Sequence, residues 1–399
     1  MEGLRTVTRG RKLDPTSERL IPELTPAVTP VNKVMTLEEA LDRTAELAEK
    51  ALSRGTFGVA GLLTGPGGMV YAEAMNMTQR KGKPYDPTGH VERQLIDWYF
   101  EAARAGAKLP PPGHMLILSS LDPCAMCSGS TIKAGFKTVA IDLDGGEAGI
   151  HDVHGLPHRM PRELWAVAES SIHLITSRSG RALLSRQFPE SEAPGPKRLS
   201  GIIERCRNAF EHSYLQMLYG LEKNRNGAAG DLRTLLRDLH SELPDTLEIP
   251  PAEIHTVAGG NRRVIEGLLG DERVCLIDPH GRPLLIARGR EELSPIRIAV
   301  IELVRSYSQF RSHVHDSHGI DMPGMKSLSV LMRDAPATPI DAFHQLGSMG
   351  TFVLEKGHEG GMPLLAYLNG DDGRIRRYAG ALPPHYTRHE GFFAGTLPF

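Results

Sequence analysis

Two short stretches of this chain decide what its N-terminal half can fold into: Asp86-Pro87-Thr88-Gly89-His90-Val91-Glu92 and, further along, Leu121-Asp122-Pro123-Cys124-Ala125-Met126-Cys127. Together they spell H-x-E followed by P-C-x-x-C. A run with helical spacing follows each stretch, so we expect His90 and Cys124 at the starts of two helices. Because helix N-termini carry partial positive charge, the two thiols are expected to ionise readily.

The residue types in these stretches predict a catalytic zinc centre. Two thiolates and one neutral imidazole, from Cys124, Cys127 and His90, fill three positions of a tetrahedral zinc and leave the fourth open for water. An open position distinguishes a catalytic zinc from a structural one. Glu92 lies two residues after His90, so on the first helical turn its carboxylate can move protons beside the metal without ligating it.

Other interpretations of the cysteine pair have to be weighed. A lone C-x-x-C could be a redox pair, half of a structural zinc site or two buried small residues. Pro123 before the first cysteine, the upstream H-x-E and the helical context at both places agree with each other and favour catalytic zinc. The presence of Glu92, which chemistry needs and metal binding does not, argues against a non-catalytic protein.

A histidine-rich loop further along could suggest a second metal site. His151, His154 and His158 stand in a loop with Gly155 and Pro157. The loop contains neither cysteine nor paired carboxylates, and histidines in such loops more often face solvent or rim a substrate site. We therefore expect no second metal here.

Composition limits the class of protein. The 399 residues are 40% hydrophobic and 24% charged, with a formal net charge of −2, which fits a soluble fold of two domains. Nothing resembles the basic footprint of a general nucleic-acid binder. Four cysteines are too few for a disulfide scaffold, which favours the reducing cytoplasm. No apolar run reaches the roughly 20 residues of a membrane span, and the N-terminus lacks an apolar leader.

The pattern along the N-terminal half predicts an α/β domain over residues 36–187, preceded by an extended N-terminal arm, 1–35. A capping box at Thr36 opens an amphipathic helix. Strands and helices then alternate, which builds a three-layer α-β-α sandwich around a mixed five-stranded sheet whose last two strands run parallel. The expected strands are 57–63, 69–74, 115–119, 138–143 and 172–176, and the expected helices begin at Thr36, His90, Cys124 and Pro161.

Both stretches resemble the D-P-T-x-H-x-E and L-E-P-C-x-M-C-x-G motifs of the cytidine deaminase-like superfamily, nearest to the branch of guanine deaminases, fungal-type cytosine deaminase and tRNA adenosine deaminases. The resemblance covers about 36–187 and implies a zinc-dependent deaminase that releases ammonia. It implies that Asn76 bonds the base and that Val91 and Pro123 adjoin it. Asn76 could equally be a turn residue. Val91 and Asp122 depart from the usual Ala and Glu.

The pattern after a Pro-rich linker, 188–198, predicts a repeat of the first half, so a C-terminal α/β domain is expected over 199–399. A hairpin around 274–287, a helix from Ile298, a strand over 327–332, a helix over 340–346 and a strand over 351–354 would match the first domain. The metal positions would then be Ile298, Ala337 and Ile340, and the glutamate position Val300. Such a copy cannot bind zinc and could serve as an intramolecular pseudo-dimer partner. The alternative is chance similarity between α/β domains, and a homodimer is also possible.

Three functional classes remain open. The first is a deaminase of a free nucleobase, nucleoside or related amino-heterocycle, which the near-neutral charge favours. The second is a tRNA or other nucleic-acid editing deaminase with a fused inactive partner domain, which would need a basic stripe. Only Arg80 and Lys81-Gly82-Lys83 offer basic charge near the site. The third is a non-catalytic binding or regulatory protein. The motifs do not specify the base, or whether ribose or phosphate is required.

Overall fold

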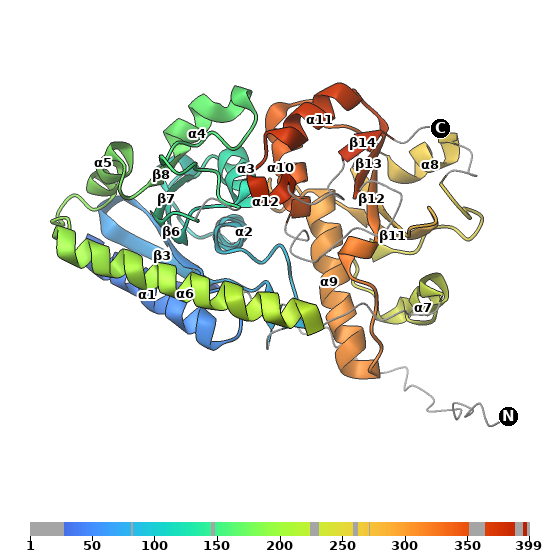
Figure 1. The fold of residues 1–399 in the computed structure, drawn as a ribbon, viewed down its shortest axis with the longest axis horizontal. Helices are drawn as coiled ribbons and strands as arrows, with labels where there is room; N and C mark the ends of the chain where they lie inside the picture. Colours follow the sequence, from blue (N-terminus) through green and yellow to red (C-terminus); the bar gives the residue numbers. More distant parts are fainter. Residues whose placement is uncertain are drawn as a thin grey trace.

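A computed structural model describes residues 28–80, 83–144, 148–223, 231–257, 262–270, 272–350, 364–387 and 394–396. It contains two six-stranded sheets, each with helices packed on it (Figure 1). We refer to residues 28–223 as the N-terminal unit and to residues 231–396 as the C-terminal unit. Within the described part of the chain, no helix has the length and apolar character needed to cross a membrane.

The sheet of the N-terminal unit is mixed, with strand order β1-β3-β2-β6-β7-β8. Its first three neighbouring pairs run antiparallel, and β6, β7 and β8 run parallel to each other. The α/β class and the parallel last pair are thus confirmed, with six strands in place of the five expected. The strands are β1 (Val28–Val34), β2 (Ala60–Thr64), β3 (Met69–Met75), β6 (Leu116–Leu121), β7 (Lys137–Asp142) and β8 (Ile172–Leu174).

The sixth strand, β1, comes from the segment expected to be an arm. It pairs along β3 at the sheet edge, with a change of register between Pro30 and Lys33. Asn32 lies between them in the left-handed region, with φ 51°. A bulge of this kind breaks the alternation of apolar and polar residues that identifies a strand in sequence. Residues 1–27 lie outside the described residues.

Helices cover both faces of this sheet. One face packs on α1 (Leu37–Ser53), α5 (Arg178–Gln187) and α6 (Pro196–Lys223), and the other face packs on α2 (Val91–Arg104). The capping box at Thr36 is present, as expected. The cysteine-bearing helix α3 (Ala125–Ala134) and α4 (Trp165–Ser171) complete the unit, and a small hairpin, β4 (Gln79–Arg80) and β5 (Lys83–Pro84), precedes the zinc motif.

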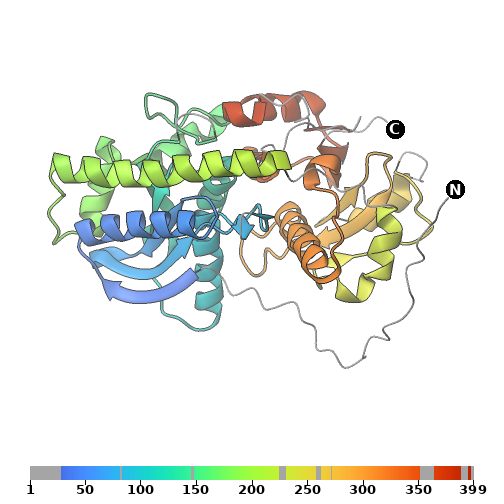
Figure 2. The same cartoon turned by 60° about the horizontal axis from the view of Figure 1, so that its bottom comes forward.

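The long helix α6 belongs physically to the N-terminal unit, although its sequence follows the expected linker. It runs beside α1 (Figure 2). The guanidinium of Arg205 pairs with Asp42 and Glu49 of α1, and that of Arg207 pairs with the buried Asp142 at the end of β7. Apolar side chains between Leu199 and Tyr214 pack against the core of the N-terminal unit. The boundary expected between the linker and the second domain stays a prediction.

The C-terminal unit repeats this topology. Its strand order is β9-β11-β10-β12-β13-β14, again with three antiparallel pairs followed by two parallel ones. Each strand thus has a counterpart at the same place and in the same direction in the first sheet. The strands are β9 (Leu247–Glu248), β10 (Arg273–Ile277), β11 (Pro283–Arg288), β12 (Ser329–Asp334), β13 (Leu365–Asn369) and β14 (Ala394–Thr396).

The helices of the two units correspond as well. A helix precedes each hairpin, a long helix follows it, and shorter helices connect the parallel strands. The strand expected over 351–354 lies outside the described residues, and β13 occupies the corresponding place in the sheet. The C-terminal helices are α7 (Leu232–Asp238), α8 (Arg262–Leu269), α9 (Ala299–His318), α10 (Pro339–Gly350), α11 (Asp372–Gly380) and α12 (Pro384–Thr387).

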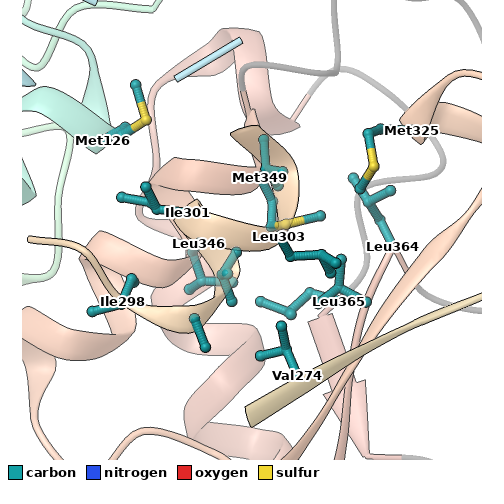
Figure 3. Packing of buried hydrophobic residues seen from close by; sticks show 14 of the residues in the cluster. Met126, Val274, Ile298, Ile301, Leu303, Met325, Leu346, Met349, Leu364 and Leu365 are labelled. Carbon is teal, nitrogen blue, oxygen red and sulfur yellow. The ribbon is translucent and has the colours of Figure 1, made fainter. Parts of the chain in front are cut away.

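The two units meet through corresponding helices, α3 and α10, which lie side by side (Figure 1). Glycines allow this close approach: a methyl group on Gly347 would lie 2.6 Å from the backbone nitrogen of Met126, and one on Gly129 would lie 2.9 Å from the Cα of His344. The side chain of Met126 joins the hydrophobic core of the C-terminal unit beside Ile301 and Met349 (Figure 3). The helix that carries the cysteines therefore packs against both units.

Candidate zinc centre

His90 is the N-cap of α2, as the sequence predicts. Its backbone is extended, with φ −71° and ψ 151°. The preceding turn is held by Asp86, whose Oδ1 accepts hydrogen bonds from the backbone nitrogen of Thr88 at 2.9 Å and from its hydroxyl at 2.7 Å. The other carboxylate oxygen of Asp86 accepts a hydrogen bond from Gln309 of α9 at 3.1 Å. The C-terminal unit thus contacts the loop that presents the imidazole.

The two cysteines lie at the start of α3, with Cys124 as its N-cap and Cys127 on its first turn. The Nδ1 of His90 lies 3.5 Å from the Sγ of Cys124, and the donor atoms of all three residues lie within 4.8 Å of one another. Two donors on a tetrahedral zinc with ordinary bond lengths are about 3.5 Å apart. Donor types and spacing therefore fit a zinc ion with a fourth position left open.

The pKa values of the two thiols shift in opposite directions. A hydrogen bond from Cys127 and the neighbouring His90 hold the pKa of Cys124 well below its usual value, although burial opposes this. Burial and the negative charge of Cys124 raise the pKa of Cys127. The expectation that both thiols ionise readily thus holds for Cys124 alone, because two adjacent thiolates repel each other in a buried site. Zinc binding would release the Cys127 proton.

Glu92 lies on the first turn of α2 and is 3% exposed. Its Oε1 accepts a 2.7 Å hydrogen bond from the hydroxyl of Ser119, a buried residue of β6. Burial raises the pKa of the carboxyl, and the hydrogen bond from Ser119 opposes this. A carboxyl with a raised pKa can both accept and release a proton near neutral pH. The sequence did not indicate this role of Ser119, because the pattern of its segment predicts only a buried strand.

Asn76 follows β3 and is buried. Its Oδ1 accepts hydrogen bonds from the Thr78 backbone nitrogen at 2.8 Å, the Thr78 hydroxyl at 2.7 Å and the Thr56 hydroxyl at 3.0 Å. Because the Thr78 backbone nitrogen can only donate, it fixes the oxygen of the amide in this turn. The amide nitrogen is the group through which Asn76 could donate to a base. Its role in substrate binding stays a prediction.

Val91 and Pro123, also expected near the substrate, have structural partners. Val91 is fully buried, and its side chain packs where a methyl group on Gly61 would lie 2.7 Å away. The carbonyl oxygen of Pro123 accepts hydrogen bonds from the Ile150 backbone nitrogen at 3.2 Å and the Ser128 hydroxyl at 3.3 Å. These contacts place both residues in the framework around the metal ligands, and substrate contact remains a prediction.

The histidine-rich loop contributes one buried residue near the site. The Nδ1 of His151 lies 2.6 Å from the Oδ1 of Asp122, and the backbone of His151 donates to the other carboxylate oxygen. His158 instead stacks on the ring of Trp165. In the described part of the chain, the only group of three metal-donor side chains close enough to share an ion is His90, Cys124 and Cys127.

The corresponding positions in the C-terminal unit cannot form this centre. Ile298 is the N-cap of α9, with nearly the same backbone angles as His90, and Val300 takes the place of Glu92. The alignment of the two halves of the chain is wrong by one residue at the positions expected to match Cys124 and Cys127. Thr338 caps α10 through a hydrogen bond from the Asp341 backbone nitrogen at 3.2 Å, so Thr338 and Asp341, rather than Ala337 and Ile340, correspond to the two cysteines.

Comparison with known proteins agrees with this geometry. Residues 35–143 match the family described as the cytidine and deoxycytidylate deaminase zinc-binding region. The matched residues lie within the N-terminal unit and include His90, Glu92 and both cysteines of the candidate site. Similar solved structures include one from a study of tRNA:A34 deaminases, with 18% identity over 34% of this chain and 96% of that chain and a TM-score of 0.27. A guanine deaminase from Nitrosomonas europaea shares 14% identity over 45% of this chain and 88% of that chain, with a TM-score of 0.28. No curated protein matches.

Proposed function

We propose that this protein is a zinc-dependent aminohydrolase that replaces an exocyclic amine on a small heterocycle by oxygen and releases ammonia. The observation that carries the proposal is the convergence of one imidazole and two thiols within 4.8 Å of one another, with the buried carboxyl of Glu92 nearby and outside this group of donors. His90, Cys124 and Cys127 would hold the metal. When bound, zinc would supply a Lewis acid that activates water.

Glu92 would move the proton in this reaction. Its buried carboxylate would take a proton from the attacking water and deliver it to the departing nitrogen, which leaves as ammonia. The Ser119 hydroxyl donates to Oε1 and so limits the rotation of the carboxyl. A carboxyl with a raised pKa suits both halves of this transfer, because it holds a proton more readily than an exposed glutamate does.

The contacts of nearby cations favour a small substrate over a nucleic acid. The Lys83 amine lies 2.8 Å from the Nε2 of His315, and the Arg80 guanidinium lies over the ring of Tyr85. Each of these two exposed cations has a partner within the protein, and Lys81 lies outside the described residues. Binding to a phosphate backbone needs a stripe of cations available to it. The overall net charge of −2 also disfavours a polyanion.

In this proposal the C-terminal unit acts as an inert structural partner. It lacks the ligands and the glutamate, yet α10 packs on the cysteine helix and α9 contacts the loop before His90. A fused partner of this kind would hold both metal-binding segments in place without a second active site. The unit would then be needed for metal binding and would contribute no turnover of its own.

Ammonia release from the full chain tests the proposal. Purified protein is assayed with cytosine, guanine, adenine, their nucleosides and substituted amino-heterocycles, and Glu92→Gln is the inactive reference. Turnover of at least one small heterocycle is expected. Ammonia release from RNA alone, lost steeply as salt is raised, would instead point to nucleic-acid editing. Release from none of them, with zinc bound, would contradict the proposed reaction class.

A further inference from the structure

Tyr386 of the C-terminal unit lies at the zinc centre of the N-terminal unit. It belongs to α12, the short helix after α11, far from the zinc motifs in sequence. Its side chain is 1% exposed and belongs to the same core cluster as Cys124 and Cys127. Figure 1 shows α12 beside α3. A residue of the inert copy therefore enters the surroundings of the metal ligands.

The hydroxyl of Tyr386 is satisfied by the start of the cysteine helix. It donates a hydrogen bond to the Sγ of Cys124 and accepts one from the backbone nitrogen of Ala125. A phenol hydroxyl can donate as well as accept, so this one hydroxyl serves both the sulfur and the backbone nitrogen. The same sulfur is placed to bind zinc, 3.5 Å from the imidazole of His90.

We infer that Tyr386 is a positioning residue of the zinc centre, through which the C-terminal unit orients and tunes the Cys124 thiolate. A hydrogen bond to a ligating sulfur stabilises its negative charge and lowers its electron donation to the metal. The first effect strengthens metal binding, because the thiolate is the form of cysteine that binds a metal. The second leaves the metal a stronger Lewis acid. This inference rests on the proposed zinc site and adds a residue to it.

Packing alone does not account for the hydroxyl. A phenylalanine would fill the same volume, and a buried hydroxyl costs free energy unless it is bonded. Tyr367 provides the matched comparison in the same unit, because it is also fully buried and its hydroxyl donates to the Oε1 of Gln345 at 3.3 Å instead of to a sulfur. Loss of the hydroxyl from Tyr386 and from Tyr367 should lower the free energy of unfolding by similar amounts. Only the loss from Tyr386 should change metal binding.

The test measures metal binding in the full chain. Tyr386→Phe and Tyr367→Phe are compared with the unmodified protein for Zn²⁺ affinity, by competition with a chromogenic chelator, and for the thiolate-to-metal charge-transfer band of Co²⁺ bound in place of zinc. Tyr386→Phe should weaken Zn²⁺ binding about 10-fold to 100-fold and move the band to longer wavelength, because the sulfur electrons are less stabilised. Tyr367→Phe should change neither.

A second measurement tests the same inference if the Tyr386→Phe protein does not fold. Replacement of every tyrosine by 3-fluorotyrosine, a more acidic phenol and a stronger donor, should move the Co²⁺ band to shorter wavelength. An unmodified protein that binds neither ion at one per chain would refute the proposed function. One that binds zinc normally, with no change of affinity or band in either experiment, would refute the role of Tyr386 alone.

Discussion

The Oγ of Ser130 lies 2.9 Å from the Nε2 of His344, where α3 of the N-terminal unit meets α10 of the C-terminal unit. Counted from the helix caps Cys124 and Thr338, the two residues occupy corresponding positions. The contact therefore lies on the approximate two-fold axis that relates the two units, as it would in a symmetric dimer. A charged histidine could not be tolerated at this buried place without a partner for its proton.

The first prediction concerns the pH dependence of stability. Burial, followed by the positive charges of Lys133 and Arg93, lowers the pKa of His344 to about 3 from 6.5, although Asp341 opposes this. Between pH 6.5 and 3, His344 therefore binds a proton in the unfolded chain and stays neutral in the folded chain. The contribution of His344 to the free energy of unfolding is fully present above pH 6.5 and falls by about 1.4 kcal/mol per pH unit as the pH decreases toward 3.

Urea unfolding at pH 7.5, 6 and 5 with metal removed checks this. His344→Gln should show a shallower loss of stability toward low pH than the unmodified chain. His212→Gln, which alters an exposed histidine on α6, should keep the original slope. Identical slopes for all three proteins would show that His344 does not titrate as the structure requires.

The second prediction concerns the contact between α3 and α10. A methyl group at position 347 would lie 2.6 Å from the Met126 backbone nitrogen, so Gly347→Ala must push α10 away from the cysteine helix. We expect a loss of about 1–3 kcal/mol in the free energy of unfolding, together with weaker zinc binding, because Met126 lies between the two ligands. Chemical unfolding and chelator competition measure the two effects.

Gly267→Ala is the matched control for this substitution. Gly267 lies in α8, with nothing within 4 Å of the added methyl group. Alanine there should leave zinc binding unchanged and raise stability slightly, by about 0.5–1 kcal/mol, since glycine is unfavourable in a helix. Equal effects of the two substitutions on zinc affinity would argue against coupling between the α3–α10 contact and the metal centre.

The third prediction concerns Ser119. Removal of its hydroxyl in Ser119→Ala frees the carboxyl of Glu92 to rotate, so kcat should fall about 10-fold to 100-fold, part of what a general acid and base contributes. Zinc content should stay the same. The control is Ser120→Ala, whose hydroxyl accepts a hydrogen bond from the Ala60 backbone nitrogen at 3.0 Å. That change should lower stability and leave kcat nearly unaltered.

The fourth prediction separates chemistry from metal binding. Glu92→Gln keeps the size of the side chain and removes its ability to take a proton, so turnover should be abolished while zinc stays bound. Glu101→Gln makes the same chemical change on an exposed part of the same helix and should keep full activity. Near-normal rates for Glu92→Gln would show that another group moves the proton.

Local sequence signals predicted the parts of this molecule that depend on local chemistry. The capping box at Thr36 and the helix starts at His90 and Cys124 are all present, because caps act within a few residues. The pattern predicted β1 poorly, since its bulge interrupts the alternation. It also misplaced the cap of α10, because Pro336 resembles Pro123 whereas the cap is Thr338, followed by Pro339.

Contacts between distant segments could not be predicted in this way. Nothing in the spacing around Tyr386 indicates that its hydroxyl meets Cys124, because that contact exists only after two sheets have formed and packed. The bond between Ser119 and Glu92 depends on how α2 crosses β6. The hydrogen bond from Gln309 to Asp86 joins the two units. Such side chains complete a site whose ligands alone are visible in sequence.

Elemental analysis of the purified full chain tests the central claim most directly. One zinc per chain is expected in the unmodified protein and in Glu92→Gln, and much less in Cys127→Ser. Cys275→Ser is the control, since burial raises the pKa of that thiol to about 12 and Cys275 lies outside the cluster of metal donors. It should retain the full zinc content. An unmodified protein without stoichiometric metal, or a Cys127→Ser protein that keeps it, would contradict the account.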